Sequence, residues 1–481
     1  MRDILLDTID IFEVNRKDAA KVFADLDVYF PQDLFAPRGT PVDKLQSPDI
    51  SSTWKQEDTV VEAIFARLFK LPNPPHREVY YHSLLMELCM VAPKALAPSF
   101  GRAIRAIYSK LAITDGEVAY RFYDWFTHHL SNFGFSWKWN EWTGDIALPE
   151  SHPRRVFIRE VLEKELRLSY HGRIQGTIPE EYQFLIGDEP PSTNFKYANE
   201  DEELYPEASA LLESMRQKKD QSEILQQLVH IETRAREEGL ENPEFESLEI
   251  LVQIVLYLGE MSFSHALNNI ERNLQPLIQK CNANQQARRH TISVVMDFWK
   301  FQPSIGAILL DKLLNYTVLT PLSVIEWLLV DSTFADRAFA WEISFKTIDK
   351  VNARVTRLST QVSNLETQEM QNEPQREHFE RAKKTLAGTQ AEQKEVFIML
   401  VEKFPGLIEK LKEKDDSEMS TEDGGPWGEW WGKQWMKVIF RRVMPMPEVG
   451  ELAVPLKELA IKKGSPDYLR EVLEQVAVLS R

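Results

Sequence analysis

Hydrophobic residues recur with helical spacing along most of the chain. In the segment VVEAIFARLFKL (60–71), Val60, Ile64 and Leu68 lie four residues apart, and each has an apolar neighbour beside it. Such a stripe is typical of a helix that packs one face against a core. The same spacing returns in EVYYHSLLMELCMVAPKAL, FGRAIRAIYSKL, EVAYRFYDWFTHHL and RRVFIREVLEKELRLSYHGRI, whereas almost no segment alternates as a strand does. The pattern predicts an all-α fold of antiparallel helices stacked in pairs, a HEAT-like helical-repeat solenoid.

One segment interrupts the helical pattern. The stretch GDEPPSTNFKYANEDEELYP (187–206) combines proline and acidic residues with a loss of periodicity. A chain of 481 residues is also too long for one core of ordinary size. We therefore predict a helical-repeat domain over 1–185, a linker over 186–205 and a second helical-repeat domain over 206–481.

The second predicted domain contains a coiled-coil seam. Its apolar positions alternate between spacings of three and four: Ile348, Val351, Val355, Leu358, Val362 and Leu365. Pro374 should stop this helix, because proline lacks the backbone N–H donor. A returning helix is expected over 378–404. The sequence thus predicts a protruding helical hairpin over about 345–404, which can serve either as a solvated strut or as a grip for a partner.

Two aromatic clusters allow several interpretations. In HHLSNFGFSWKWNEW (128–142), aromatic residues alternate from Phe133 and then include Trp142. They can plug the core, contact a partner, or carry stacked nucleic-acid bases. Near the C-terminus, a helix beginning at GGP places Trp427, Trp431 and Trp435 roughly on one face, as core or as a docking patch.

Composition and motifs restrict the chemistry. The formal net charge of −17 makes the chain as a whole a poor binder of phosphate backbone. Cys89 and Cys281 fit two buried thiols in a reducing compartment, and no apolar run is long enough to predict a membrane span. The adjacent His128 and His129 point to different sides of a helix. Without a phosphate loop, metal motif or nucleophile motif, we predict no enzyme activity, no metal and no cofactor.

Arginine is concentrated on one helical segment of this acidic chain. The segment 155–173 has a predicted core stripe of Ile158, Leu162, Leu166 and Tyr170, with arginines on its far side. Glu163 lies four residues from both Arg159 and Arg167, so intrahelical pairing is one explanation and an acidic partner is the other. The candidate partner-interface residues are Arg155, Arg159, Arg167, Tyr170, His171, Arg173, Trp137 and Trp139.

Five long stretches together resemble one family, the large subunit of the nuclear cap-binding complex, in a form similar to that of fungi. They are VVEAIFARLFKLPNPPHREVYYHSLLMELC (60–89), WFTHHLSNFGFSWKWNEW (125–142), FIREVLEKELRLSYHGRI (157–174), SFSHALNNIERN (262–273) and FAWEISFKTIDKVNARV (339–355). The resemblance implies helical domains like the middle domain of translation-initiation scaffolds. It also implies that this sequence holds the second and third of the family's three domains and lacks the first.

The resemblance further implies a function. In this family the large subunit is a scaffold that orders a small RNA-recognition-motif subunit, and the small subunit holds the 7-methylguanosine cap. The expected partners are that small subunit, capped RNA through it, and adaptors for splicing, export and RNA decay. The expected location is the nucleus, with shuttling to the cytoplasm. The alternative is a helical middle-domain protein that binds structured RNA or translation factors directly.

Overall fold

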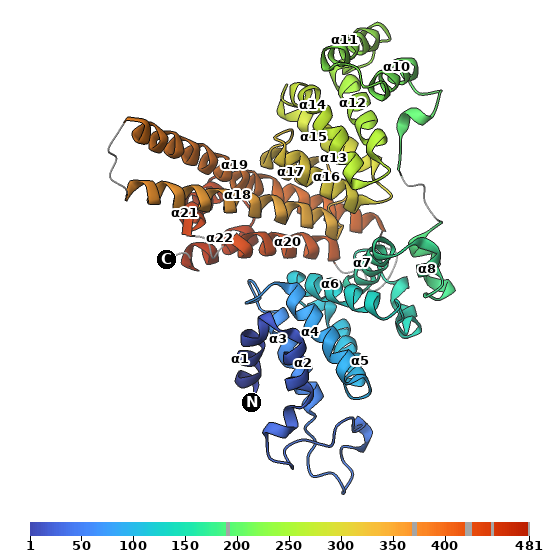
Figure 1. Ribbon diagram of the computed structural model, residues 1–481, viewed down its shortest axis with the longest axis vertical. Coiled ribbons are helices and arrows are strands. Elements are labelled where there is room, and N and C mark those ends of the chain that lie inside the picture. The colour runs from blue at the N-terminus through green and yellow to red at the C-terminus, as the bar shows by residue number, and fades with distance from the viewer. Residues whose placement is uncertain (189–192, 368–372, 419–425, 444–446, 480–481) are drawn as a thin grey trace. The chain divides into compact units, whose positions relative to one another are not determined.

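The chain folds into helices joined by turns and by loops of different lengths, of which a long one connects residues 24 and 56 (Figure 1). The computed structural model describes residues 1–188, 193–367, 373–418, 426–443 and 447–479, and these ranges contain no β-strand. The all-α prediction is therefore confirmed. No helix in this described part of the chain is both long and apolar enough to cross a membrane.

The chain divides into two compact units. Unit 1 comprises Met1–Asp188 together with Ser417–Arg442, and unit 2 comprises Glu189–Asp416 together with Val443–Arg481. The first boundary lies inside the predicted linker. However, Ser417–Arg442 returns to unit 1, although the sequence placed it in the second domain. The predicted domain limits themselves remain a prediction.

Unit 1 is a succession of helices that pack either on the next helix or on the helix two places along the chain. Its helices are α1 (Arg2–Ile11), α2 (Arg16–Ala24), α3 (Gln56–Leu68), α4 (Glu78–Val91), α5 (Pro93–Ser109), α6 (Gly116–Asn132), α7 (Pro153–Leu168), α8 (His171–Gln175), α9 (Gln183–Ile186) and most of α20 (Trp427–Val443). The stripe predicted for the first of these segments is buried in α3, since Val60, Ile64 and Leu68 are at most 1% exposed. The helical spacing thus identified the core face correctly.

Unit 2 repeats this organisation, with α12 packed against both α11 and α15. Its helices are α10 (Tyr205–Arg216), α11 (Gln221–Glu237), α12 (Pro243–Gly259), α13 (Phe263–Arg272), α14 (Leu274–Cys281), α15 (Gln285–Phe298), α16 (Pro303–Asn315), α17 (Pro321–Glu326), α18 (Ala338–Glu366), α19 (Glu373–Glu418), α21 (Pro447–Lys462) and α22 (Asp467–Leu479). In α12 most apolar side chains are buried, as expected for a central helix that contacts several neighbours.

The helix α20 is held in unit 1 by polar contacts with α6 and the segment before α7. Arg441 donates two hydrogen bonds, of 2.9 and 2.7 Å, to the carboxylate of Asp115. Trp431 donates from Nε1 to the backbone oxygen of Ser151 at 2.9 Å. The side chain of Trp435 is 4% exposed. These contacts favour the core interpretation of the C-terminal tryptophans. A spacing rule cannot predict them, because the partners lie about 280 to 330 positions earlier in the chain.

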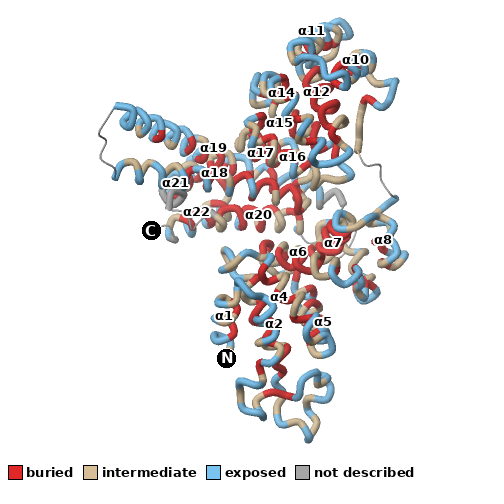
Figure 2. The backbone as a smooth tube through the Cα atoms, in the orientation of Figure 1, coloured by how far each residue is buried: buried red, intermediate tan, exposed pale blue. Residues whose placement is uncertain are grey.

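The predicted hairpin is formed by α18 and α19, which lie side by side and project from the rest of unit 2 (Figure 1). At its base, Ile348, Val351 and Val355 are buried, whereas Leu358 and the later seam residues are half-buried (Figure 2). Part of the predicted hairpin tip, 368–372, lies outside the described residues. Pro374 stands in the first turn of α19, where its missing N–H costs little, and α18 has already ended at Glu366.

A buried amide pair joins the two hairpin helices. Gln393 donates from Nε2 to Oδ1 of Asn352 at 2.7 Å, and the two residues are 3% and 1% exposed. Asn352→Leu should lower the free energy of unfolding by about 1–3 kcal/mol, because it leaves the Gln393 amide buried without this acceptor. Adding Gln393→Leu should restore most of the loss, as measured by calorimetric unfolding. Equal losses in the single and double variants would contradict this account.

Candidate partner-binding surface

The arginine-bearing segment begins as the well-capped helix α7. The side chain of His152 accepts a hydrogen bond from the backbone N–H of Arg154, and Pro153 occupies the first turn. The predicted core stripe is buried at Ile158 and Leu162, which are at most 1% exposed. This face of α7 packs on α6.

The first two arginines of the segment are engaged by the chain itself. Arg155 donates from Nη1 to the backbone oxygen of Leu148 at 2.6 Å and lies 3.4 Å from the Glu150 carboxylate. Arg159 pairs with Glu160 at 3.1 Å, and its side chain is only 16% exposed. Because both guanidinium groups have intramolecular partners and little exposed surface, they are weak candidates for a partner contact.

The end of the segment is more accessible. The helix α7 ends at Leu168, and Tyr170 has the extended backbone that precedes α8. Tyr170 is 65% exposed, so its predicted place in the core stripe is wrong. The physical reason is that the helical spacing no longer applies once the helix has ended. Arg167 and Leu168 are exposed beside it, and together these three side chains form what we term the α7 end patch.

Two further candidates flank the α7 end patch. His171 lies with Nε2 2.9 Å from the backbone oxygen of Gly187. The guanidinium of Arg173 lies 5.0 Å from the ring centre of Phe135. This distance permits a cation–π contact, which is worth about 0.5–1 kcal/mol at an exposed site. Both residues therefore combine an exposed or half-exposed position with a contact that orients the side chain.

The alternating aromatic segment is mainly core. After α6 the chain reverses through the left-handed residues Gly134 (φ 71°) and Phe135 (φ 59°), and then forms a 3-10 helix over Trp139–Ala147. Trp139 is 1% exposed, and its backbone oxygen accepts a hydrogen bond from Tyr182 at 2.7 Å. It cannot offer its ring to a partner without unfolding this corner. Trp142 is also buried and stacks on a tyrosine ring at 3.8 Å.

Trp137 differs from its neighbours in the aromatic segment. Its side chain is half-buried, and the guanidinium of Arg105 lies 5.2 Å from its ring centre. Arg105 is in turn held by the Glu141 carboxylate at 2.6 and 2.8 Å. One face of this indole is thus covered by a fixed cation, so Trp137 is a less open stacking surface than the sequence suggested.

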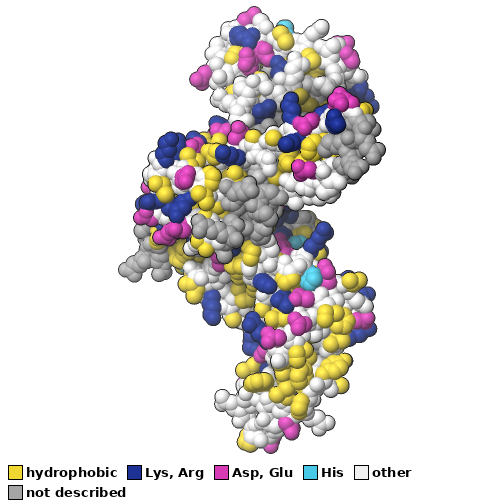
Figure 3. Space-filling view, turned by 90° about the vertical axis from the view of Figure 1, so that its left-hand side faces the viewer, with side chains coloured by type: hydrophobic (Ala, Val, Ile, Leu, Met, Phe, Trp, Pro, Cys, Tyr) yellow, Lys and Arg dark blue, Asp and Glu magenta, His cyan; other side chains and the backbone are white. Residues whose placement is uncertain are grey.

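On the face drawn in Figure 3, the described residues form no uniform basic region. Lys and Arg side chains alternate there with Asp and Glu, and hydrophobic side chains gather on its lower part, in unit 1. Two exposed apolar residues of unit 1, Ile11 and Val14, lie at the end of α1 and just after it. A mixed surface of this kind does not provide the clustered Lys and Arg that phosphate-backbone binding requires.

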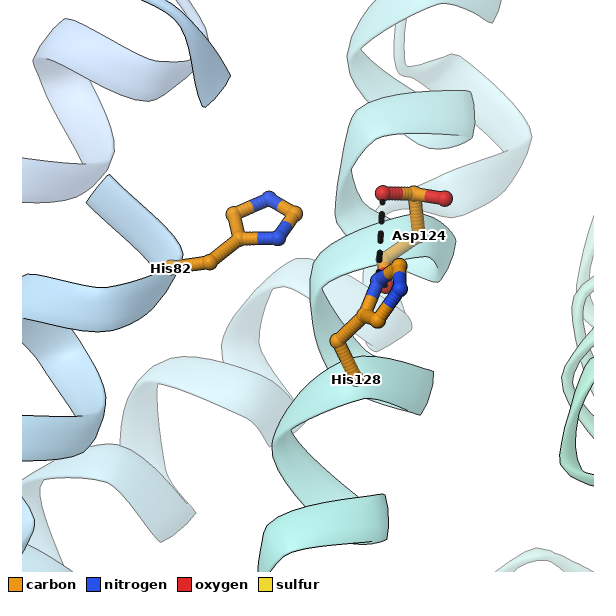
Figure 4. A group of neighbouring side chains, drawn as sticks. All are labelled: His82, Asp124 and His128. Carbon is orange, nitrogen blue, oxygen red and sulfur yellow. Dashed lines mark hydrogen bonds and ion pairs between the residues drawn. The ribbon is translucent and has the colours of Figure 1, made fainter. Parts of the chain in front are cut away.

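One group of side chains was not foreseen from the sequence. His82 of α4 and Asp124 and His128 of α6 each place a ligand atom within 4.8 Å of the other two (Figure 4). Asp124 also pairs with Lys164 of α7. Burial, with His128 and Lys164 nearby, lowers the pKa of His82 to about 3. The spacing of four between Asp124 and His128 is a visible signal, but nothing in the sequence brings His82 to them.

His128 and His129 do point to different sides of α6, as expected. The ring of His129 stacks on Trp125 at 5.0 Å and on Phe100 at 5.5 Å. Burial lowers the pKa of His129 to about 4, so this histidine is neutral in the folded protein at physiological pH. The ring of His129 therefore packs against core aromatic side chains, whereas His128 has a side chain that is 41% exposed.

Comparisons with known proteins agree with this architecture. Residues 1–180 match a family model described as MIF4G like, and residues 195–446 match a second model with the same description. Nuclear cap-binding protein subunit 1 of Schizosaccharomyces pombe is 41% identical over 378 residues, which cover 78% of this chain and 47% of that protein. The proteins of the same name from Xenopus tropicalis and Homo sapiens are 32% and 30% identical, over 72% of this chain and 46% of each.

The predicted resemblance to the large subunit of the nuclear cap-binding complex is thus confirmed, and the fungal relative is more similar than these two vertebrate ones. The chain spans about half the length of the curated relatives it matches. The second family match alone extends over more than half of the 481 residues. The chain therefore belongs to the MIF4G-like family of helical proteins.

Proposed function

We propose that this chain acts as a non-catalytic scaffold in a nuclear cap-binding complex. In this role it binds a small RNA-recognition-motif subunit and orders it to hold the 7-methylguanosine cap. The observation that carries the proposal is the similarity to nuclear cap-binding protein subunit 1 over 78% of the chain. The proposal also includes the binding of adaptors for splicing, export and RNA decay. It further includes a location in the nucleus, with shuttling of the chain to the cytoplasm.

The physical character of the chain supports a scaffold. The net charge of −17 opposes direct RNA binding over the surface as a whole. In the aromatic segment Trp139 and Trp142 are buried and Trp137 is half-buried, so the segment offers no open pair of indole rings between which a cap could stack. A protein that contributes to cap binding in this way must act through a partner. Its own contribution is a helical surface to which that partner binds.

The experiment that tests this function is co-purification of the chain with a cap-binding RNA-recognition-motif protein. A fluorescent cap analogue is then titrated into the chain alone and into the assembled pair. We expect a stable pair, cap binding by the pair, and no micromolar binding by the chain alone. Failure to form a pair would overturn the proposal. Cap or RNA binding by the isolated chain would favour the alternative of a direct RNA binder.

We place the α7 end patch at or beside the surface used for a partner. Tyrosine and arginine are enriched at binding hot spots, and Tyr170 and Arg167 stand together at the end of a helix whose opposite face is fixed in the core. The double change Tyr170→Ala and Arg167→Ala should weaken association with the small subunit or an adaptor by about 2 kcal/mol or more, with little change in melting temperature. Calorimetry with each partner measures the effect.

A matched control is available in the same unit. Tyr29 is 66% exposed, close to the 65% of Tyr170. Tyr29→Ala removes an equally exposed ring far from α7 in the sequence, and it should leave both affinities unchanged. If Tyr170→Ala and Tyr29→Ala have the same effect on binding, the α7 end patch has no special role.

A further inference from the structure

We propose that His82, Asp124 and His128 form a binding site for a divalent transition-metal ion of the zinc, cobalt or nickel type. This inference is independent of the proposed scaffold function, because it concerns the packing of α4 against α6. Two imidazoles and a carboxylate are a donor set that such ions accept readily. The three side chains approach one another from α4 and α6 (Figure 4).

The geometry requires only small adjustments. One ligand atom from each residue lies within 4.8 Å of those of the other two. A tetrahedral zinc ion with bonds of about 2.0–2.1 Å holds its ligand atoms roughly 3.3 Å apart. Side-chain rotations that move each donor by about 1 Å would close the site. Asp124 and His128 lie one turn apart on the same face of α6, so these two ligands are already side by side.

The two histidines are placed to serve as ligands. Nε2 of His82 is buried and has no hydrogen-bond partner within the described part of the chain, which is costly for a polar atom unless something else satisfies it. Nδ1 of His128 lies 2.9 Å from the backbone oxygen of Asp124. If Nδ1 donates its hydrogen there, this contact fixes the ring and leaves Nε2 as the nitrogen for the ion. The His128 side chain is 41% exposed, so an ion can reach the site from solvent.

The main competitor for the site is a cation of the protein. The Lys164 ammonium pairs with Oδ1 of Asp124, while Oδ2 of the same carboxylate lies 3.4 Å from His128 Nδ1. A metal ion would therefore share the carboxylate with Lys164, and repulsion between the two cations should moderate its affinity. Three protein ligands also leave at least one position for water or a further donor.

Metal binding would cross-link two helices that already pack together. Because the ion binds the folded arrangement and not the unfolded chain, it should raise the melting temperature of unit 1. Zinc chloride titrated into the full chain by calorimetry should show one site. Binding of cobalt(II) should give the visible absorption of an ion with nitrogen and oxygen ligands.

Changes of the proposed ligands test whether zinc binds at this site and not elsewhere. His82→Phe keeps a ring of similar size, and together with His128→Ala it tests the two imidazoles. Each change should lower zinc affinity at least about tenfold, a loss that already follows from disturbing the partners of metal ligands. Lys164→Met should have the opposite effect and tighten binding, because it removes the competing cation. Circular dichroism of the metal-free variants establishes that each one is folded.

His76→Ala is the control, because His76 is an imidazole of unit 1 that also lies near carboxylates, 3.6 Å from Asp10 and 3.1 Å from Glu13. It should bind zinc as the unchanged chain does. The proposal is overturned if zinc does not bind at micromolar concentrations, or if His82→Phe and His128→Ala retain full affinity. It is also overturned if His76→Ala abolishes binding.

Discussion

Arg121→Met is expected to lower the free energy of unfolding of unit 1 by about 3–5 kcal/mol, the usual loss when one member of a buried ion pair is removed. Arg121 is 0% exposed. It donates hydrogen bonds to the backbone oxygens of Leu68 at 3.1 Å, Lys70 at 2.9 Å and Pro72 at 2.7 Å, and it pairs with Glu117. Methionine fills similar volume but leaves three carbonyl groups without this donor.

The neighbouring charges limit the loss and supply a control. The Glu117 carboxylate also lies 3.4 Å from Arg441 and 3.3 Å from Arg442 on α20, so it is not left without a cation. Adding Glu117→Gln to Arg121→Met should recover part of the stability, since it removes the buried charge. Because the chain has two units, hydrogen exchange of the α6 amides is the appropriate measurement. A loss below about 1 kcal/mol would show that this network is dispensable.

The helices could be predicted from the sequence because the spacing of apolar residues within each helix indicates which face is buried. The stripes in α3 and in the first half of α7 are buried as the spacing indicated. The prediction failed for Tyr170, where periodicity was extended past Leu168, the last residue of the helix. It did not place α20 in unit 1, because the pairing of Arg441 with Asp115 depends on tertiary folding and not on local sequence.

The candidate site was harder to predict for the same reason. An arginine looks available from a helical wheel, but Arg155 is held by the backbone of Leu148, in a loop that no wheel includes. Alternating aromatics likewise do not reveal exposure, since Trp139 is buried while Phe133, six residues earlier, is 41% exposed. Residue type and spacing limit what a segment can do, and the loops around it decide which side chains remain accessible.

Stability should also depend on pH through Glu165, a buried acid on α7. Glu165 is 0% exposed, and neither carboxylate oxygen has a hydrogen-bond partner among the described residues. Burial raises the pKa of Glu165 from 4.5 to about 8. The folded protein therefore holds this proton more tightly than the unfolded chain does. Below pH 4.5 Glu165 is protonated in both the folded and the unfolded state, so its titration does not change the free energy of unfolding. As the pH rises from 4.5 to about 8, the free energy of unfolding falls.

Glu165→Gln isolates this contribution, because glutamine has the same shape and cannot ionise. Near pH 5 the variant and the unchanged chain should be almost equally stable. Near pH 9 the variant should be more stable by roughly 3–5 kcal/mol, since each unit of pKa shift corresponds to about 1.4 kcal/mol. Urea unfolding at the two pH values measures the difference, with the exposed Glu180→Gln as a control that removes the same charge. A pH-independent difference between Glu165→Gln and the unchanged chain would mean that Glu165 is ionised when folded, and hence that a cation reaches it inside unit 1.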